Sequence, residues 1–364
     1  MKESPAKDLH GNAAARPGAF RFRLATPRDL PHCVGLLPPG LRLPPSLRRR
    51  LPEIWADLLA GDARTFPIID NIEDDHPANI EGFGLSVFVT DAFAEGLIGT
   101  PTAYAPVQFY ERLVAGDKVL LAREQVEAAQ LADGINVFGV HFGLRNHDLS
   151  DPRSVQVLNA GSAAFYFFHS GYRIRTIMTE HHGMQSVRYM ERGGFKLVHD
   201  FRRLSPAAFA EVRDEDLPHF FALRREWVEP AAINPLSQLF AAQPPRIYFS
   251  ASERRLLERA LLNESDAAIA DALGISRNAV LKTWRGIYER VDRQLPQLIP
   301  KGGATDGSRG QEKRRHLLLY LRAHLEELRP GRRKTEETGA AAARGARLGG
   351  INRRSPGRPG SRNR

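Results

Sequence analysis

The stretch Phe249–Val291 constrains the fold of this chain more than any other, because its apolar spacing predicts three consecutive short helices. Small Ala270 is followed by Gly274 and then by Val280. An alanine lets two helices cross closely, a glycine allows the positive φ of a tight turn, and a valine fills a shared core. This spacing is typical of a helix-turn-helix, which we expect within residues 246–300.

The net charge of +10 is concentrated at one end of the chain. Residues 301–364 hold 17 Lys and Arg against 6 Asp and Glu, a net charge of +11, so residues 1–300 carry a net charge of −1. Residues 330–364 are rich in Gly, Ala and Arg, and we expect them to be a disordered basic tail that contacts double-stranded DNA. Within it, Arg353, Arg354 and Arg358 resemble an AT-hook, and the alternative is a nonspecific polyanion-binding tail.

Cysteine content and hydropathy predict a cytoplasmic protein, and the expected DNA binding would associate it with the nucleoid. The single cysteine, Cys33, excludes an internal disulfide, and its place on an apolar helix face indicates buried packing rather than a nucleophile. No stretch reaches the roughly 18–20 apolar residues that a membrane helix requires. The first residues lack the apolar segment of a secretory signal.

Alternating strand and helix patterns predict an α/β layered domain over residues 20–203. We expect strands near 20–25, 65–70, 80–90, 135–144, 172–179 and 195–202, with helices near 26–37, 46–60, 106–131, 154–171 and 182–192. Residues 1–19 are predicted to be disordered, and the proline-punctuated residues 204–245 to be a helical linker. Residues 311–329 form an amphipathic helix whose leucine seam, Leu318, Leu321, Leu325 and Leu328, suits packing between the subunits of a homodimer.

Histidines and aromatic residues in the α/β region invite two sharper interpretations. The spacing of His141, His147, His169, His181 and His182 matches no standard zinc pattern, so we expect ordinary core or surface histidines and no metal. The aromatic run Phe165–Phe168 is expected in the core, with the wall of a ligand pocket as the alternative.

The helix-turn-helix stretch resembles the LuxR-type (GerE) DNA-binding domain of bacterial transcription regulators. The matching residues are Ser250-x-x-Glu253, Ile269-Ala270-x-x-Leu273-Gly274-Ile275-Ser276, Val280 and Ile287-Tyr288. Thr283 and Gly286 depart from the family pattern. The resemblance implies that the third helix enters the major groove of DNA. The residues that would read it are Arg277, Asn278, Leu281, Lys282 and Arg285.

Residues 20–203 resemble the GNAT N-acetyltransferase superfamily. The opening motif is Arg23-Leu24-Ala25-Thr26-x-x-Asp29, and the closing motif is Ser186-Val187-Arg188-Tyr189-Met190-Glu191-Arg192-Gly193-Gly194-Phe195. The resemblance implies a mixed sheet with helices and an acetyl-CoA pyrophosphate held at a Gly-rich helix start. Residues 145–152 contain two aspartates and no glycine. Met190 stands where the family often has the tyrosine that protonates the leaving thiolate. We therefore expect a GNAT-like domain without catalysis or cofactor.

Together these patterns predict a sequence-specific transcription regulator. Its α/β domain would bind a small-molecule ligand or mediate dimerisation, and its helix-turn-helix would bind DNA. The alternative is an N-acyltransferase that uses acetyl-CoA and is fused to a DNA-binding module. Binding of acetyl-CoA would distinguish the two.

Overall fold

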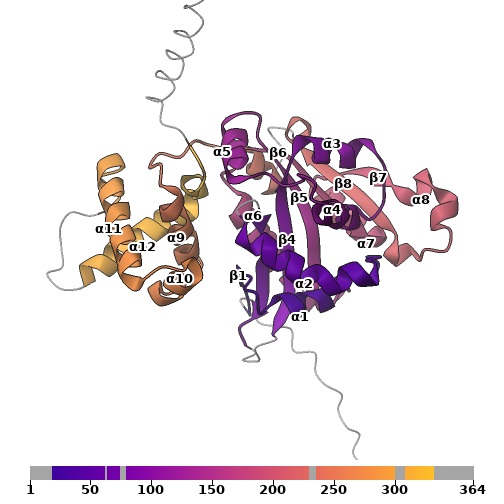
Figure 1. Ribbon diagram of the computed structural model, residues 1–364, viewed down its shortest axis with the longest axis horizontal. Helices are drawn as coiled ribbons and strands as arrows, with labels where there is room; N and C mark the ends of the chain where they lie inside the picture. The colour runs from indigo at the N-terminus through magenta and orange to yellow at the C-terminus, as the bar shows by residue number, and fades with distance from the viewer. Residues whose placement is uncertain (1–18, 62–63, 74–78, 229–234, 300–307, 332–364) are drawn as a thin grey trace, which may run out of the picture.

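The computed structural model describes residues 19–61, 64–73, 79–228, 235–299 and 308–331. They form an α/β part, built around one twisted sheet, and a smaller all-α part beside it (Figure 1). No helix in these ranges has the length and apolar character needed to cross a lipid bilayer. The expected tail residues Arg353, Arg354 and Arg358, and residues 1–18, lie outside the described ranges.

Eight strands of the described chain form a single mixed sheet in the order β1-β3-β4-β5-β6-β8-β7, with β2 paired to β4. All neighbouring strands run antiparallel except β5 and β6, which run parallel. The mixed α/β sheet expected for a GNAT-like domain is therefore confirmed. The strands are β1 Phe20–Leu24, β2 Arg64–Thr65, β3 Pro67–Asn71, β4 Ile80–Val89, β5 Ile135–Leu144, β6 Ile174–His182, β7 Lys196–Asp200 and β8 Pro218–Arg224.

Helices cover both faces of this sheet (Figure 1). On one face lie α1 Leu30–Gly35, α2 Pro45–Ala60, α3 Asp91–Gly99 and α4 Ala105–Val114. On the other lie α5 Arg123–Leu131, α6 Pro152–His169 and α7 Gly183–Arg192. The short α8 Phe201–Leu204 and the 3-10 helices η1 Pro206–Phe209, η2 Asp214–Asp216, η3 Arg225–Trp227 and η4 Pro235–Phe240 complete this part.

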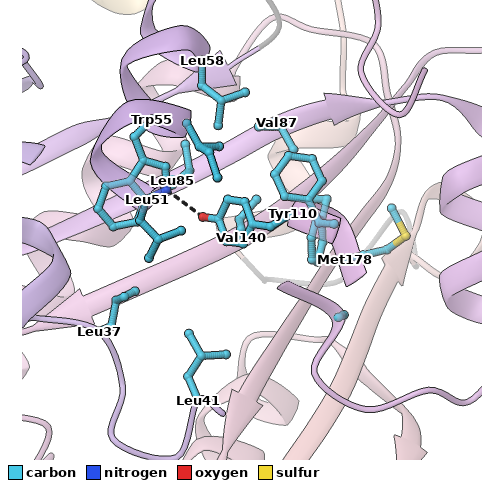
Figure 2. Close-up of a cluster of buried hydrophobic side chains, with 14 of the residues drawn as sticks. Leu37, Leu41, Leu51, Trp55, Leu58, Leu85, Val87, Tyr110, Val140 and Met178 are labelled. Atoms are coloured by element: carbon cyan, nitrogen blue, oxygen red, sulfur yellow. Dashed lines mark hydrogen bonds between the residues drawn. The ribbon is translucent and has the colours of Figure 1, made fainter. Parts of the chain in front are cut away.

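Trp55 of α2 anchors the larger core cluster (Figure 2). The ring is fully buried, and its Nε1–H donates a 2.7 Å hydrogen bond to the Tyr110 hydroxyl of α4. The apolar stripe expected over residues 46–60 faces the sheet, since Leu51 and Leu58 are buried with it. Burying such side chains stabilises the fold by about 1.5–3 kcal/mol each. Cys33 is also buried here, as expected for a packing residue.

The sheet extends further along the chain than the sequence indicated. β8 lies between β6 and β7 and pairs antiparallel with both, from Pro218 to Arg224. These residues were expected to belong to a helical linker spanning 204–245, which is wrong for this segment. PHFFALR is buried on both sides of the sheet, so its apolar residues do not alternate with polar ones and give no strand signal.

The all-α part contains α9 Ala251–Leu261, α10 Asp266–Leu273, α11 Arg277–Gln294, α12 Ser308–Ala323 and the 3-10 helix η5 Leu325–Leu328. Gly274 adopts φ 64° at the end of α10, so a side chain there would be strained. Ala270 and Val280 are buried in the shared core. Leu321, Leu325 and Leu328 are buried in the same cluster, so this part of the expected intersubunit seam packs within its own chain.

Arg329 joins the two parts. Its Nε–H donates a 2.8 Å hydrogen bond to the Ser170 carbonyl, and the guanidinium lies 4.5 Å from the centre of the Tyr172 ring. A further N–H donates to the Phe167 carbonyl at 3.0 Å, while Glu258 of α9 lies 3.4 Å away. The side chain is only 2% exposed, so it acts as a buried, hydrogen-bonded clamp between α6 and the helical part.

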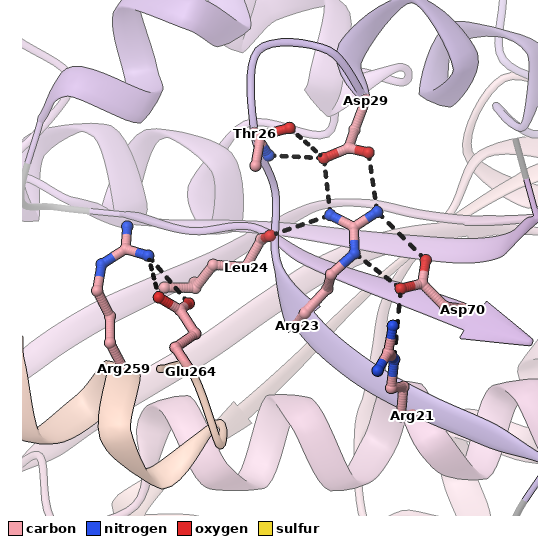
Figure 3. Close-up of polar contacts among 8 residues, drawn as sticks. All are labelled: Arg21, Arg23, Leu24, Thr26, Asp29, Asp70, Arg259 and Glu264. Carbon is pink, nitrogen blue, oxygen red and sulfur yellow. Dashed lines mark hydrogen bonds and ion pairs between the residues drawn. The ribbon is translucent and has the colours of Figure 1, made fainter. Parts of the chain in front are cut away.

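The first strand is held by one arginine (Figure 3). The guanidinium of Arg23 donates two 2.8 Å hydrogen bonds to Asp29 and one of 2.7 Å to Asp70. Burial alone would raise the pKa of Asp29, but hydrogen bonds from Arg23 and Thr26 outweigh it and lower that pKa. The Arg23-to-Asp29 motif, which suggested the GNAT resemblance, thus ties β1, β3 and the start of α1 together.

Candidate active site

β5 and β6 diverge at their carboxyl-terminal ends. Their parallel pairing runs only to Gly139 and Thr179. Beyond that point β5 continues with β4 to Leu144, and β6 continues with β8 to His182. A cavity of about 530 Å³ lies where the strands part. Carboxyl ends of neighbouring parallel strands are a common place for ligand sites, because the backbone opens a crevice there.

The cavity is lined by the ends of β5 and β6 and by residues of α7 and η2. The segment that precedes α2 lines it as well. Apolar side chains predominate on the β5 and α6 side, where Leu144, Leu149 and Leu158 lie. The polar groups of the lining come from both strands and from the segments of α7 and η2. They include His141, His147, Glu180, His181, His182, Tyr189, Arg213, Asp214, Glu215 and Asp216.

Glu180 is a buried carboxyl group with one oxygen engaged. Its Oε2 accepts a 3.1 Å hydrogen bond from the amide of Ala105, the first residue of α4. Its Oε1 is buried and has no hydrogen-bond partner. Burial raises the pKa of Glu180 to about 8, and the hydrogen bonds from the α4 start only partly offset it. A carboxyl of this kind exchanges its proton near neutral pH, as a general base does.

Two neutral imidazoles line the same cavity. Burial lowers the pKa of His141 to about 3 and that of His182 to about 4. The Nε2 atoms of both rings are buried without a partner. His141 stacks on Tyr110 at 5.6 Å and His182 on Tyr104 at 6.5 Å between ring centroids. Uncharged at pH 7, the rings supply hydrogen-bonding atoms without the positive charge that would lower the pKa of Glu180.

Tyr104 sets the geometry at the start of α4. It adopts φ 62° and ψ 49°, a left-handed conformation that is uncommon for a tyrosine. The hydroxyl of this residue is also buried without a partner. The turn directs the free amide of Ala105 toward Glu180, and an unsatisfied amide at a helix start stabilises negative charge.

Tyr189 of α7 also lines the cavity. The GNAT resemblance places the tyrosine that acts as general acid at position 190, where this chain has Met190. In the structure both residues line the cavity. Tyr189 is 40% exposed, and its hydroxyl lies 3.3 Å from Ser162 Oγ of α6. A phenol is therefore available at the cavity after all.

The histidines divide into two groups. His169 lies outside the cavity. Its Nε2 is 2.9 Å from Ser86 Oγ and its Nδ1 is 2.7 Å from the Phe165 carbonyl, so it is a hydrogen-bonded core residue, as expected. His141, His147, His181 and His182 instead share the cavity with Glu180, so treating them as ordinary core or surface residues missed the site. Within the described ranges, no three His, Cys, Asp or Glu side chains are arranged to hold a metal ion.

The start of α6 does not fit the pyrophosphate of acetyl-CoA. Asp151 caps the helix and accepts a 3.0 Å hydrogen bond from the Arg153 amide. Asp148 accepts another at 2.9 Å from the Ser150 amide. The amides that would bind a phosphate thus already bond to carboxylates. The resemblance to acetyl-CoA enzymes does not extend to this loop.

The expected DNA-reading residues lie together on α11. Arg277, Asn278, Leu281, Lys282 and Arg285 are all exposed. The turn before them faces a second cavity of about 430 Å³ between the two parts. Leu273 and Ile275 line one wall, and Leu24 and Gly61 line the other. The α/β part therefore stands beside the turn that would have to approach the DNA backbone.

Comparison with known proteins gives structural likenesses only. No family model and no curated protein sequence matches the chain. Solved structures that match include FeeM, an N-acyl amino acid synthase from uncultured soil microbes (12% identity, 57% of this chain and 92% of that one, TM-score 0.32). An acetyltransferase from Thermus thermophilus matches at 12% identity, over 57% of this chain and 97% of that one, with a TM-score of 0.30. NAA60 of Arabidopsis thaliana, in complex with acetyl-CoA, matches at 12% identity, over 56% of this chain and 98% of that one, with a TM-score of 0.32. Scores this low assign this chain neither activity nor substrate.

The LuxR-type assignment, with the DNA binding and transcription regulation that it implied, is wrong. No family model matches the chain, so nothing beyond the quoted motif residues supports that assignment. The physical reason lies in what the motif encodes. Ala270, Gly274 and Val280 specify close helix packing around a tight turn, which any compact three-helix unit requires.

Proposed function

We propose that the cavity between β5 and β6 is the active site of an acyltransferase that acylates an amine. The observation that carries the proposal is the unpartnered Oε1 of Glu180, buried at the cavity with a pKa of about 8. An amine nucleophile must lose a proton to become a stable amide, and a base of this pKa accepts one readily near neutral pH.

The transfer proceeds from a thioester. A neutral amine bound near Glu180 attacks the acyl carbon and gives one proton to Oε1 as the C–N bond forms. The C–S bond breaks, and the departing sulfur takes a proton from the hydroxyl of Tyr189. The products are an amide and a thiol, and solvent returns the proton from Glu180 to Tyr189. Both groups line the cavity, and they come from different elements, β6 and α7.

The surroundings of Glu180 support this assignment. The Ala105 amide stabilises the ionised carboxylate, and burial opposes ionisation, so the group can both take and release a proton. Asp214, Glu215 and Asp216 of η2 line the cavity, and they are paired with two arginines, Arg202 and Arg213. The one net negative charge that remains attracts a cationic amine before it enters.

The test is thiol release from acyl thioesters in the presence of a panel of amines, with the amide product identified by mass spectrometry. Glu180→Gln should lower kcat/KM about 10²–10⁴-fold, the usual contribution of a general base. Glu111→Gln, on the exposed face of α4, is the matched control and should keep full activity. Equal activity of the native protein and Glu180→Gln would overturn the assignment.

A further inference from the structure

The cavity between the α/β part and the helical part is separate from the one at Glu180. It has a volume of about 430 Å³, and the two cavities share no lining residue. The end of α2, β2 and the segment after α6 line it on one side, and α9 and the turn after α10 line it on the other. Small ligands bind preferentially where two packed units meet. The charges of the lining show what kind of ligand suits this place.

Three arginines line this cavity, and they come from both parts of the molecule. Arg64 of β2 donates a 3.1 Å hydrogen bond from Nε to the Leu58 carbonyl and another from a terminal nitrogen to the Leu59 carbonyl. These bonds hold the guanidinium in place at the end of α2. Arg255 and Arg259 lie four residues apart on α9, so they are neighbours on one face of that helix.

Two glutamates belong to this group of charges, and each faces one arginine. Glu258, the carboxylate of the lining, lies 3.4 Å from Arg329. Glu264 lies 2.9 Å from Arg259 (Figure 3). Both of its oxygens accept from the same nitrogen of Arg259, Nη1, so the remaining N–H groups of that guanidinium form no hydrogen bond within the described ranges.

Arg255 provides positive charge that no carboxylate balances. Its side chain is exposed and forms neither a hydrogen bond nor an ion pair with the described residues. The phenol of Tyr172 also lines the cavity, and burial raises its pKa, so it stays neutral at pH 7. The lining and its charged partners thus hold four arginines against two glutamates. An anion entering the cavity meets a net positive charge.

We propose that this cavity binds a small anion whose carboxylate or phosphate oxygens contact Arg255 and Arg259. Guanidinium groups present several N–H donors in a plane, which matches the oxygens of both kinds of anion. A ligand held by α9 and lying against β2 stabilises the packing of the two parts, because it binds their joined form. The site is independent of the proposed acyl transfer, since Glu180 lies in the other cavity.

Titration calorimetry with inorganic phosphate tests the site. The native chain should bind one phosphate with a Kd on the order of 1 mM or tighter. Arg255→Gln should weaken binding about tenfold or more, because it removes charged hydrogen bonds. Arg285→Gln, at an exposed arginine of α11 outside the cavity, is the matched control and should change the Kd less than about twofold. Equal binding by the native chain and Arg255→Gln would overturn the proposal.

Acetate in place of phosphate identifies the source of the oxygens. Tighter binding of phosphate indicates a phosphorylated ligand, tighter binding of acetate indicates a carboxylic acid, and failure of both contradicts the site. Differential scanning calorimetry at constant ionic strength should show phosphate raising the Tm of the native chain more than that of Arg255→Gln. Glu180→Gln should bind phosphate like the native chain. Absence of amine acylation with this binding intact would refute the proposed function and leave the anion site standing.

Discussion

The amide of Ala105 donates a 3.1 Å hydrogen bond to Oε2 of Glu180 and leaves Oε1 free at the cavity. This relationship joins the first turn of α4 to the carboxyl-terminal end of β6, two segments far apart in the sequence. The amide fixes the direction of the carboxyl group, while burial decides how strongly it holds a proton. Position and basicity of the proposed catalytic group thus have separate structural causes.

Glu180 should make the protein less stable as the pH rises. The pKa of the group is about 8 in the folded chain against an ordinary value of 4.5, so its contribution is complete below pH 4.5 and is lost as the pH rises through about 8. The Glu180→Gln variant lacks this dependence. Urea unfolding of both proteins at several pH values should show the native free energy of unfolding falling faster, by roughly 1 kcal/mol per pH unit. Parallel pH profiles would contradict the buried, protonated state.

His141 should have the opposite effect on the pH dependence of stability. Its pKa is lowered from 6.5 to about 3 by burial, so the unfolded chain takes up a proton that the folded chain refuses. Stability is therefore lost as the pH falls below 6.5 toward 3. His141→Gln should reduce this acid loss by roughly 1 kcal/mol per pH unit, measured by thermal unfolding between about pH 6.5 and 5. Exposed His32, changed to Gln, is the control, and equal effects of both changes would refute the prediction.

The sequence indicated the elements of the α/β part better than its site. Helical and strand periodicities located α2, β4 and β5, since each buries one continuous face or run. The cavity depends on where two parallel strands separate, which follows from their pairing with β4 and β8 and leaves no local pattern. The one available signal was Glu180-His181-His182, three consecutive ionisable residues at the end of a largely buried strand.

In the helical part the sequence located the helices but misled about their function. α9, α10 and α11 stand where the apolar spacing indicated, and in the structure Ser250, Ser265 and Ser276 are their N-caps. Those residues specify how helices begin and pack. They carry no information about what touches the exposed surface, and so the step from helix packing to DNA binding failed.

Arg329 should stabilise the packing of the helical part against the α/β part. Arg329→Ala leaves two carbonyls and Glu258 without their buried cation, which we expect to cost roughly 3–5 kcal/mol in the free energy of unfolding. Differential scanning calorimetry should show the loss, together with earlier melting of the helical part. Arg315→Ala, an exposed arginine of α12, should change stability by about 0.5 kcal/mol or less. A similar small change at Arg329 would mean that the clamp is dispensable.

The pH dependence of amine acylation tests the central claim most directly. An aryl amine is the acceptor of choice, because it is already neutral in mildly acidic solution and its own ionisation does not enter. The kcat/KM of the native protein should rise tenfold per pH unit and level off near pH 8, as Oε1 of Glu180 loses its proton. Glu180→Gln should show a low, flat profile. A native profile that is flat from about pH 6 to 9, or a Glu180→Gln variant with the same rise, would contradict the assignment of Glu180 as the general base.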